Sequence, residues 1–195
     1  MLRRRVFGMG LAALLAVSVA AVATPASAAE SATAAGTIPQ PVLAAAQALA
    51  GEQATATTPT FSRTSTARGP ATAAAANVIT CSARAQYPHA STGGNGIPGS
   101  IDGKAESWCD APVPYIGAQA ELYQYVPGSG FFLVSVGSLN SGPGNKKYTG
   151  VAFTICQGVP NYYVTKGIHT YTAPGGYYPP SVTLTTQSPI VQVSC

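Results

Sequence analysis

The sequence predicts an all-β protein, a two-sheet antiparallel β-sandwich of the immunoglobulin-like kind held by two disulfides. All 10 tyrosines and the single tryptophan follow Asn77, in short runs rich in Val, Ile, Thr, Tyr and Phe. Glycine and proline separate these runs, and no helical periodicity of any length interrupts them. Seven or eight short strands within residues 77–195 are typical of a sandwich or a small barrel.

The first 28 residues have the three parts of a secretory signal. Three arginines at positions 3–5 precede an apolar run, Val6–Val22, and the small residues Ala26, Ser27 and Ala28 follow it. We therefore expect cleavage after Ala28 and a secreted protein, extracellular or associated with the cell wall. The alternative is an uncleaved membrane anchor. No other stretch is apolar for long enough to cross a bilayer, so the mature chain is expected to have no membrane contact.

Residues 29–76 differ in composition from the rest of the chain. More than half of them are Ala or Thr, with prolines interspersed, and such a segment buries too little apolar area to offset its ordering entropy. We interpret it as a disordered arm or linker before the sandwich domain, residues 77–195. Within it, Pro41–Leu49 begins with proline and is rich in helix formers, which indicates a short helix that needs a partner surface.

Alternation places the strands and their faces. In the first strand Ile79, Cys81, Ala83 and Ala85 share one side, and in the third Ile116, Ala118, Ala120 and Leu122 face inward. Val151, Phe153 and Ile155 form another inward row. The expected strands are Val78–Ala85, Ile101–Cys109, Tyr115–Tyr125, Phe131–Gly137, Gly150–Cys156, Tyr162–Tyr171, Val182–Thr186 and Ile190–Cys195.

The four cysteines are expected to form disulfides, because they follow the signal and their spacing fits no metal-binding motif. Three connectivities are open. If consecutive strands pair as hairpins, Cys81 with Cys109 and Cys156 with Cys195 needs the least crossing of connections.

Charge and motif content exclude several function classes. Beyond Asn77, five Lys or Arg face four Asp or Glu, a balance of 5 − 4 = +1, which is no footprint for nucleic acid or anionic lipid. The two histidines, His89 and His169, accompany no nucleophile elbow, zinc motif or phosphate loop. We expect His89 to be structural, with its ring bonded to a neighbouring carbonyl or to Ser91. We expect Asp102, Glu106 and Asp110 to be solubilising charges on the solvent side of their strand. The protein is therefore expected to have no enzyme activity, no cofactor and no metal.

A group of tyrosines is the candidate ligand site. Tyr163, Thr165, Gly167, His169 and Tyr171 line one strand face, and Tyr177 and Tyr178 lie in a nearby loop. Aromatic rings with few charges suit recognition of a protein or a glycan. The predicted ligand-binding residues are Tyr163, Tyr171, Tyr177 and Tyr178, unless these rings fill the sandwich core.

One pattern of short motifs runs through most of the β-rich part of the chain. It comprises Pro88-His89-x-Ser91, Pro98-Gly99-x-Ile101, Cys109, Leu122-Tyr123, Cys156-x-Gly158, Tyr162-Tyr163-Val164, the loop 174–180 and Cys195. In this pattern the chain resembles a group of small exported actinobacterial proteins of uncharacterised function. The resemblance covers Thr80 to Cys195 and implies a two-disulfide, all-β extracellular domain with no activity to transfer. Gln124 stands where members of the group usually have arginine.

Together these observations predict a secreted, non-enzymatic binding or structural module whose partner is an extracellular protein or glycan. Two alternatives stay open. The chain could be a subunit of a secreted assembly, such as an antibacterial toxin particle, docking through its N-terminal arm. It could instead be an inhibitor of extracellular hydrolases that presents the loop Gly142–Lys147. The ligand and the oligomeric state are not predicted.

Overall fold

The computed structural model describes residues 37–51, 58–63, 78–92 and 99–195. These belong to one compact unit, Thr37–Cys195; the predicted signal, the rest of the arm and residues 93–98 lie outside the described residues. The elements are α1 (Gln40–Ala50), β1 (Thr60–Ser62), β2 (Val78–Ala85), β3 (His89–Ala90), β4 (Ser100–Cys109), β5 (Val113–Val126), β6 (Gly130–Val136), β7 (Asn140–Gly144), β8 (Tyr148–Ile155), β9 (Asn161–Thr172), β10 (Ser181–Gln187) and β11 (Val191–Val193).

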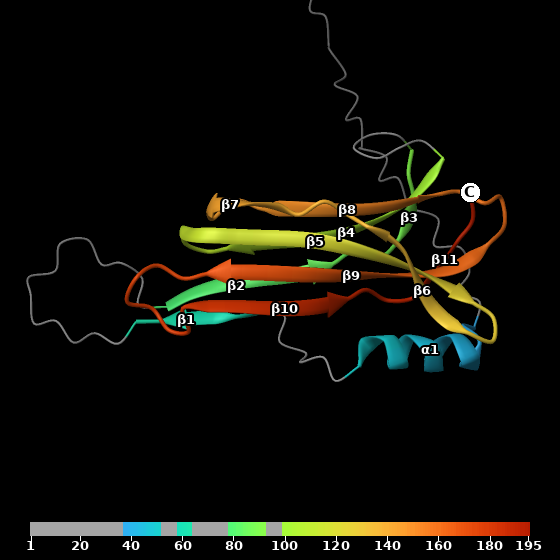
Figure 1. Ribbon diagram of the computed structural model, residues 1–195, viewed down its shortest axis with the longest axis horizontal. Coiled ribbons are helices and arrows are strands. Elements are labelled where there is room, and N and C mark those ends of the chain that lie inside the picture. Colours follow the sequence, from blue (N-terminus) through green and yellow to red (C-terminus); the bar gives the residue numbers. More distant parts are fainter. Residues whose placement is uncertain (1–36, 52–57, 64–77, 93–98) are drawn as a thin grey trace, which may run out of the picture. The chain divides into compact units, whose positions relative to one another are not determined.

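Two antiparallel sheets form the fold (Figure 1). In the first sheet β1 pairs with β2, and β4 lies between β2 and β8, with the short β3 also on β4. In the second sheet β5 and β9 are central, β10 and β11 pair with β9, and β6 and β7 pair with β5. The predicted two-sheet sandwich is confirmed, whereas its immunoglobulin-like strand arrangement stays a prediction.

Small residues let the two sheets approach closely. The predicted inward row on β5 is confirmed, since Ile116, Ala118, Ala120 and Leu122 are all fully buried. Opposite them, an added Cβ on Gly150 of β8 would lie 2.6 Å from the carbonyl oxygen of Ala118. Only a residue without a side chain fits there, because that distance is shorter than any ordinary carbon–oxygen contact.

The predicted inward row on β8 is wrong. The residues that face the second sheet are Tyr148, Gly150 and Ala152, and Val151, Phe153 and Ile155 point to the other side. Phe153 is 43% exposed and Ile155 is 75% exposed. The physical reason is the narrow gap between β8 and β5, which accepts glycine and alanine but leaves no room for a row of large side chains.

Both disulfides join the predicted cysteines. Cys81 is bonded to Cys109 and Cys156 to Cys195, and the described residues contain no free cysteine. Cys81 and Cys109 lie directly opposite each other in the pairing of β2 with β4 and are both buried. The predicted pairing is confirmed, but only the first bond lies between paired strands, since Cys156 follows β8 of the first sheet and Cys195 follows β11 of the second.

Two segments of the Ala/Thr-rich stretch have regular structure, the helix α1 and the strand β1. The sequence predicts the helix but not the strand. The expected helix is present as α1, with Val42 and Ala46 buried. Side chains of Lys166 and Gln187 donate hydrogen bonds to carbonyl oxygens of Leu49 and Ala46, so the helix has the partner surface it needs. β1 extends the first sheet, and its Phe61 is fully buried, so the sandwich includes residues before the expected boundary at 77.

Candidate functional site

The four candidate tyrosines do not form one surface. Tyr163 and Tyr171 are 1% and 0% exposed and belong to two separate core clusters. Tyr177 is half-buried against the cluster that contains Tyr171, and Tyr178 is 76% exposed. The predicted strand face from Tyr163 to Tyr171 does exist, but it faces the interior because β9 is a central strand with the other sheet packed over it. Tyr163 and Tyr171 are therefore core residues and not a recognition surface.

His169, on the same face of β9, joins Ser107 of β4 and Thr186 of β10 in a buried polar row that local sequence patterns do not reveal. The Nδ1 atom of His169 lies 2.8 Å from the Ser107 hydroxyl oxygen, and its Nε2 atom lies 2.8 Å from the Thr186 hydroxyl oxygen. Ser107 donates a hydrogen bond to the carbonyl oxygen of Gly117. Because the serine proton is used there, Nδ1 carries the imidazole proton and Nε2 accepts from Thr186. Gly167 provides the space, since a Cβ at that position would overlap the imidazole.

A serine next to a histidine is also the arrangement of a nucleophile and its base. Here Ser107 and His169 are both 0% exposed, and the third member of the row is a threonine where a catalytic row commonly has a carboxylate. Burial lowers the pKa of His169 to about 4, so the imidazole is neutral at physiological pH. This arrangement fixes the packing of three strands by satisfying every hydrogen-bonding atom of the ring.

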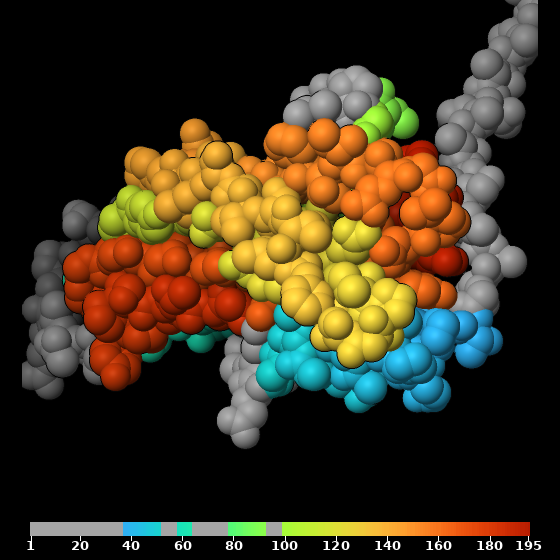
Figure 2. Space-filling model, turned by 45° about the vertical axis from the view of Figure 1, so that its right-hand side comes forward, coloured from blue at the N-terminus to red at the C-terminus, as the bar shows by residue number. Residues whose placement is uncertain are grey.

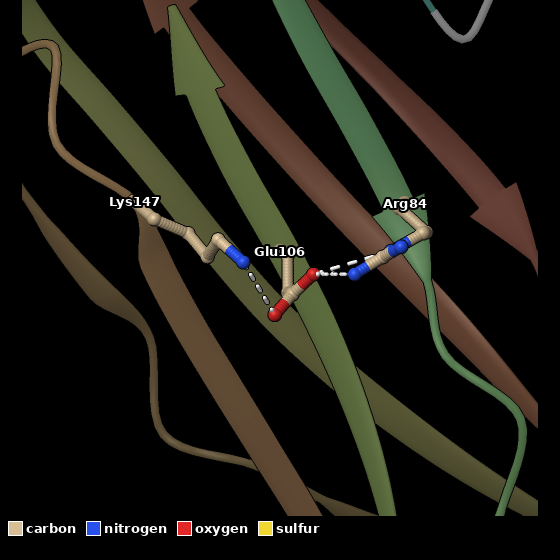
Figure 3. A network of polar contacts seen from close by, with 3 residues as sticks. All are labelled: Arg84, Glu106 and Lys147. Atoms are coloured by element: carbon tan, nitrogen blue, oxygen red, sulfur yellow. Dashed lines mark hydrogen bonds and ion pairs between the residues drawn. The ribbon is translucent and has the colours of Figure 1, made fainter. Parts of the chain in front are cut away.

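The outer face of the first sheet holds a charged network (Figure 3). Glu106 of β4 accepts hydrogen bonds from Arg84 of β2, and its other carboxylate oxygen lies 3.2 Å from Nζ of Lys147. Burial alone would raise the pKa of Glu106, but hydrogen bonds from Arg84, Gln86 and Lys147 outweigh it and lower that pKa. Lys147 also lies over the ring of Trp108. The network ties β4 to the strand on one side and the end of a loop on the other.

The other titratable groups have structural partners as well. Asp102 and Glu106, expected on a solvated side, face outward but are 1% and 6% exposed, and the Ser100 hydroxyl donates to Asp102. Asp110 accepts from the backbone amide of Thr80. The ring of His89 lies 3.3 Å from the carbonyl oxygen of Tyr87, as predicted for a structural histidine. Among the described residues no group of three or more His, Cys, Asp or Glu could hold a metal ion.

The segment 142–147 does not have the form expected of an inhibitor loop. Gly142 and Gly144 lie in β7, which pairs with β5. The hydroxyl of Tyr148 donates to the carbonyl oxygen of Pro143, and its ring packs against Gly142. The first part of the segment is therefore held to the sheet and does not project from it.

Several large apolar side chains are exposed together at one edge of the sandwich. Four side chains of β6 are strongly exposed, and three further side chains extend the surface along the β6–β7 connection and β8. This edge patch consists of Phe132 (50% exposed), Leu133 (48%), Val134 (38%), Val136 (52%), Leu139 (54%), Phe153 (43%) and Ile155 (75%). Figure 2 shows β6 in yellow and β8 in orange adjoining on one face of the molecule. Exposed apolar patches of this kind mark interaction sites.

Both faces of β6 contribute to the edge patch. Phe132 pairs with Gln124 and Leu133 with Tyr123, so their side chains point to opposite faces of the second sheet. Val134 is the extra residue of a β-bulge in this pairing. β6 pairs with β5 on one side, and none of the described strands pairs with its other side. The seven residues of β6 include no charged or proline side chain, and their backbone edge has no strand partner among the described residues, with α1 lying beside the strand.

Sequence reasoning finds β6 but not its exposure. The run from Phe131 to Val136 is almost continuously apolar, which is typical of a strand buried on both faces. The signal that could have indicated an edge is the position of the run between two glycine-containing turns, in a hairpin that is followed by the short strand β7 on the same central strand β5.

The chain matches no protein-family model, and no curated protein sequence matches it significantly. Within the described residues no helix is long and apolar enough to span a membrane.

Proposed function

We propose that the protein is a secreted, non-enzymatic binding module that contacts a protein partner through the edge patch. The observation that carries this proposal is the exposure of seven large apolar side chains on β6, β8 and the β6–β7 connection. Leaving such groups in water is unfavourable by roughly 25 cal/mol per Å² of apolar surface, so a partner that covers them gains binding free energy. The partner that this surface favours is a protein and not a glycan, since the patch is mostly aliphatic and carries no hydrogen-bonding side chain.

The placement of the titratable groups supports a role without catalysis. His169 and Ser107 are enclosed between the sheets, and Glu106 is engaged by two cations. A general acid or base must reach the reacting atoms of a substrate, and these groups are committed to packing and pairing. Two disulfides agree with an extracellular location, because such bonds persist in oxidising compartments.

A capture experiment with matched variants tests the proposal. Tagged wild-type protein, Phe132→Asp and Tyr87→Asp are incubated with culture fluid and with a cell-wall fraction of the producing organism. Phe132 and Tyr87 are aromatic and almost equally exposed, at 50% and 49%, but Tyr87 lies outside the edge patch. We expect wild type and Tyr87→Asp to retain the same partner and Phe132→Asp to lose it. Equal retention by all three proteins would show that the edge patch is not the binding surface.

A further inference from the structure

We infer that the partner of the edge patch is a second copy of this chain, so that the protein is a twofold-symmetric dimer joined along β6 and β8. The inference rests on the proposed binding role of the patch and names its occupant. Three features of the described residues carry it, namely the place of the patch on both sheets, the absence of charge on β6, and the area exposed.

The patch extends over the edges of both sheets. β6 ends the second sheet and β8 ends the first, and both edges contribute exposed apolar side chains. A single peptide strand added to β6 would pair with its backbone but would leave Phe153 and Ile155 of β8 uncovered. A folded surface with apolar side chains on two adjacent edges covers both, and this chain itself presents such a surface.

The composition of β6 permits self-pairing. In a twofold contact the same strand meets itself in the antiparallel direction, so any charged residue near the axis would face its own copy. β6 reads Gly-Phe-Phe-Leu-Val-Ser-Val and contains no charged residue, so no like charges meet across the axis. The bulge at Val134 bends the strand, while Gly130–Leu133 keeps regular pairing with β5 on its inner side.

The exposed area is close to what a stable dimer needs. From their exposed fractions, the seven residues of the edge patch expose roughly 700 Å² per copy in total, divided between the two faces of β6, the β6–β7 connection and β8, against about 800 Å² per partner in an interface of standard size. Polar groups around the patch supply the remainder, as the rim does in ordinary interfaces.

Sedimentation velocity of the purified, disulfide-bonded protein from low to high micromolar concentration tests the inference. We expect wild type to reach twice the monomer mass. Val136→Asp should weaken the dimer at least about tenfold, because it places a carboxylate in an apolar contact at each of the two symmetry-related positions. Val78→Asp is the matched control, since Val78 is a strand valine exposed to 49% against 52% for Val136 and lies on β2, away from the patch. This control should remain dimeric.

A second variant and a second measurement protect the test against misfolding. Phe132→Ser should also give monomers while its circular dichroism stays that of wild type. In hydrogen exchange, the β6 amides of wild type should become more protected as concentration rises, and those of β1 should not. Wild type that stays monomeric at every concentration, or a dimer unaffected by both variants, overturns the inference. If wild type is monomeric but capture of another protein still depends on Phe132, the dimer fails and the proposed function stands.

Discussion

The interior between the sheets and the edge at β6 differ in how their side chains are placed: buried and paired in the interior, exposed to water at the edge. Between the sheets, the polar atoms of the His169 ring are paired with Ser107 and Thr186. Glycines stand where neighbouring strands approach too closely for a side chain. At the edge, Phe132 and Val136 are half exposed and the strand has a free side among the described strands. The interior is therefore packed by the fold itself, whereas the edge leaves large apolar side chains exposed.

This difference separates residues that set stability from residues that set association. Substitutions in the interior remove packing or leave a buried polar group without its partner, which costs free energy of unfolding. Substitutions at the edge remove little from the isolated monomer, because the side chain already contacts water. Four predictions test this separation, from the largest expected change in stability to the smallest.

Removing the buried disulfide should have the largest effect. For Cys81→Ala with Cys109→Ala we expect a loss of about 3–4 kcal/mol in the free energy of unfolding, from the restored freedom of the unfolded chain and the space left in the core. Denaturant titration measures it. The comparison is Cys156→Ala with Cys195→Ala. Cys156 is half-buried and Cys195 is exposed, so removing this bond should cost less of the free energy of unfolding through lost packing. Equal or reversed losses would contradict an interior packed around the first disulfide.

Acid should destabilise the interior through His169. In the unfolded chain this histidine takes up a proton near pH 6.5, whereas burial lowers its pKa in the folded protein to about 4. The unfolded state therefore binds the proton first as the pH falls, and stability is lost between these two values, by up to about 3 kcal/mol. Below about pH 4 this contribution changes no further.

Unfolding free energies measured from pH 7 to pH 4 check the role of His169. His169→Gln should have lower stability at pH 7 and a shallower decline with acid than wild type. An unchanged slope in His169→Gln would assign the acid sensitivity to other groups.

A single added methyl group should distinguish a tolerant glycine from one that lies in close contact with the backbone of the facing sheet. Gly150→Ala places its Cβ 2.6 Å from the Ala118 carbonyl oxygen, so the sheets must shift, at a cost of about 1–3 kcal/mol. Gly175→Ala is the control, since an added Cβ there has nothing within 4 Å. Thermal melting of the two variants should show a clear drop for the first and little change for the second. A drop of similar size in both would contradict close contact between β8 and β5.

The smallest change in stability is expected at the edge. Val136→Asp should alter the free energy of unfolding, measured for the monomer at low concentration, by no more than about 0.5 kcal/mol. Denaturant titration in parallel with the Val78→Asp control measures it. A loss of several kcal/mol would mean that Val136 belongs to the core, and the contrast between interior and edge would fail at that position.

The strands could be predicted from the sequence because alternation and turn residues are local signals. β2 has the predicted bounds, and β5 and β9 differ from the prediction by one or two residues at each end. The inward direction of β8 could not be predicted in this way. Its larger side chains suggest the wrong face, and only the distance to β5, set by residues far along the chain, selects Gly150 and Ala152.

The candidate site was less predictable than the fold, for a related reason. Tyr163 and Tyr171 suit a recognition surface and a core equally well, and their burial follows from the central position of β9. The exposure of β6 depends on which strand ends the sheet, and β1 and β3 are too short to give a periodic signal. The order of strands in a sheet depends on pairings between distant parts of the chain, so local sequence patterns do not show which strand lies at the edge.

The hydrogen-bonded imidazole of His169 also gives the protein a built-in reporter. Its Nδ1 proton is enclosed between the sheets and held by the Ser107 oxygen, so its exchange with solvent requires the sandwich to open. In a nuclear magnetic resonance spectrum this single ring proton is expected as a resolved, slowly exchanging signal. Its intensity would follow opening of the two layers in real time, without any added label.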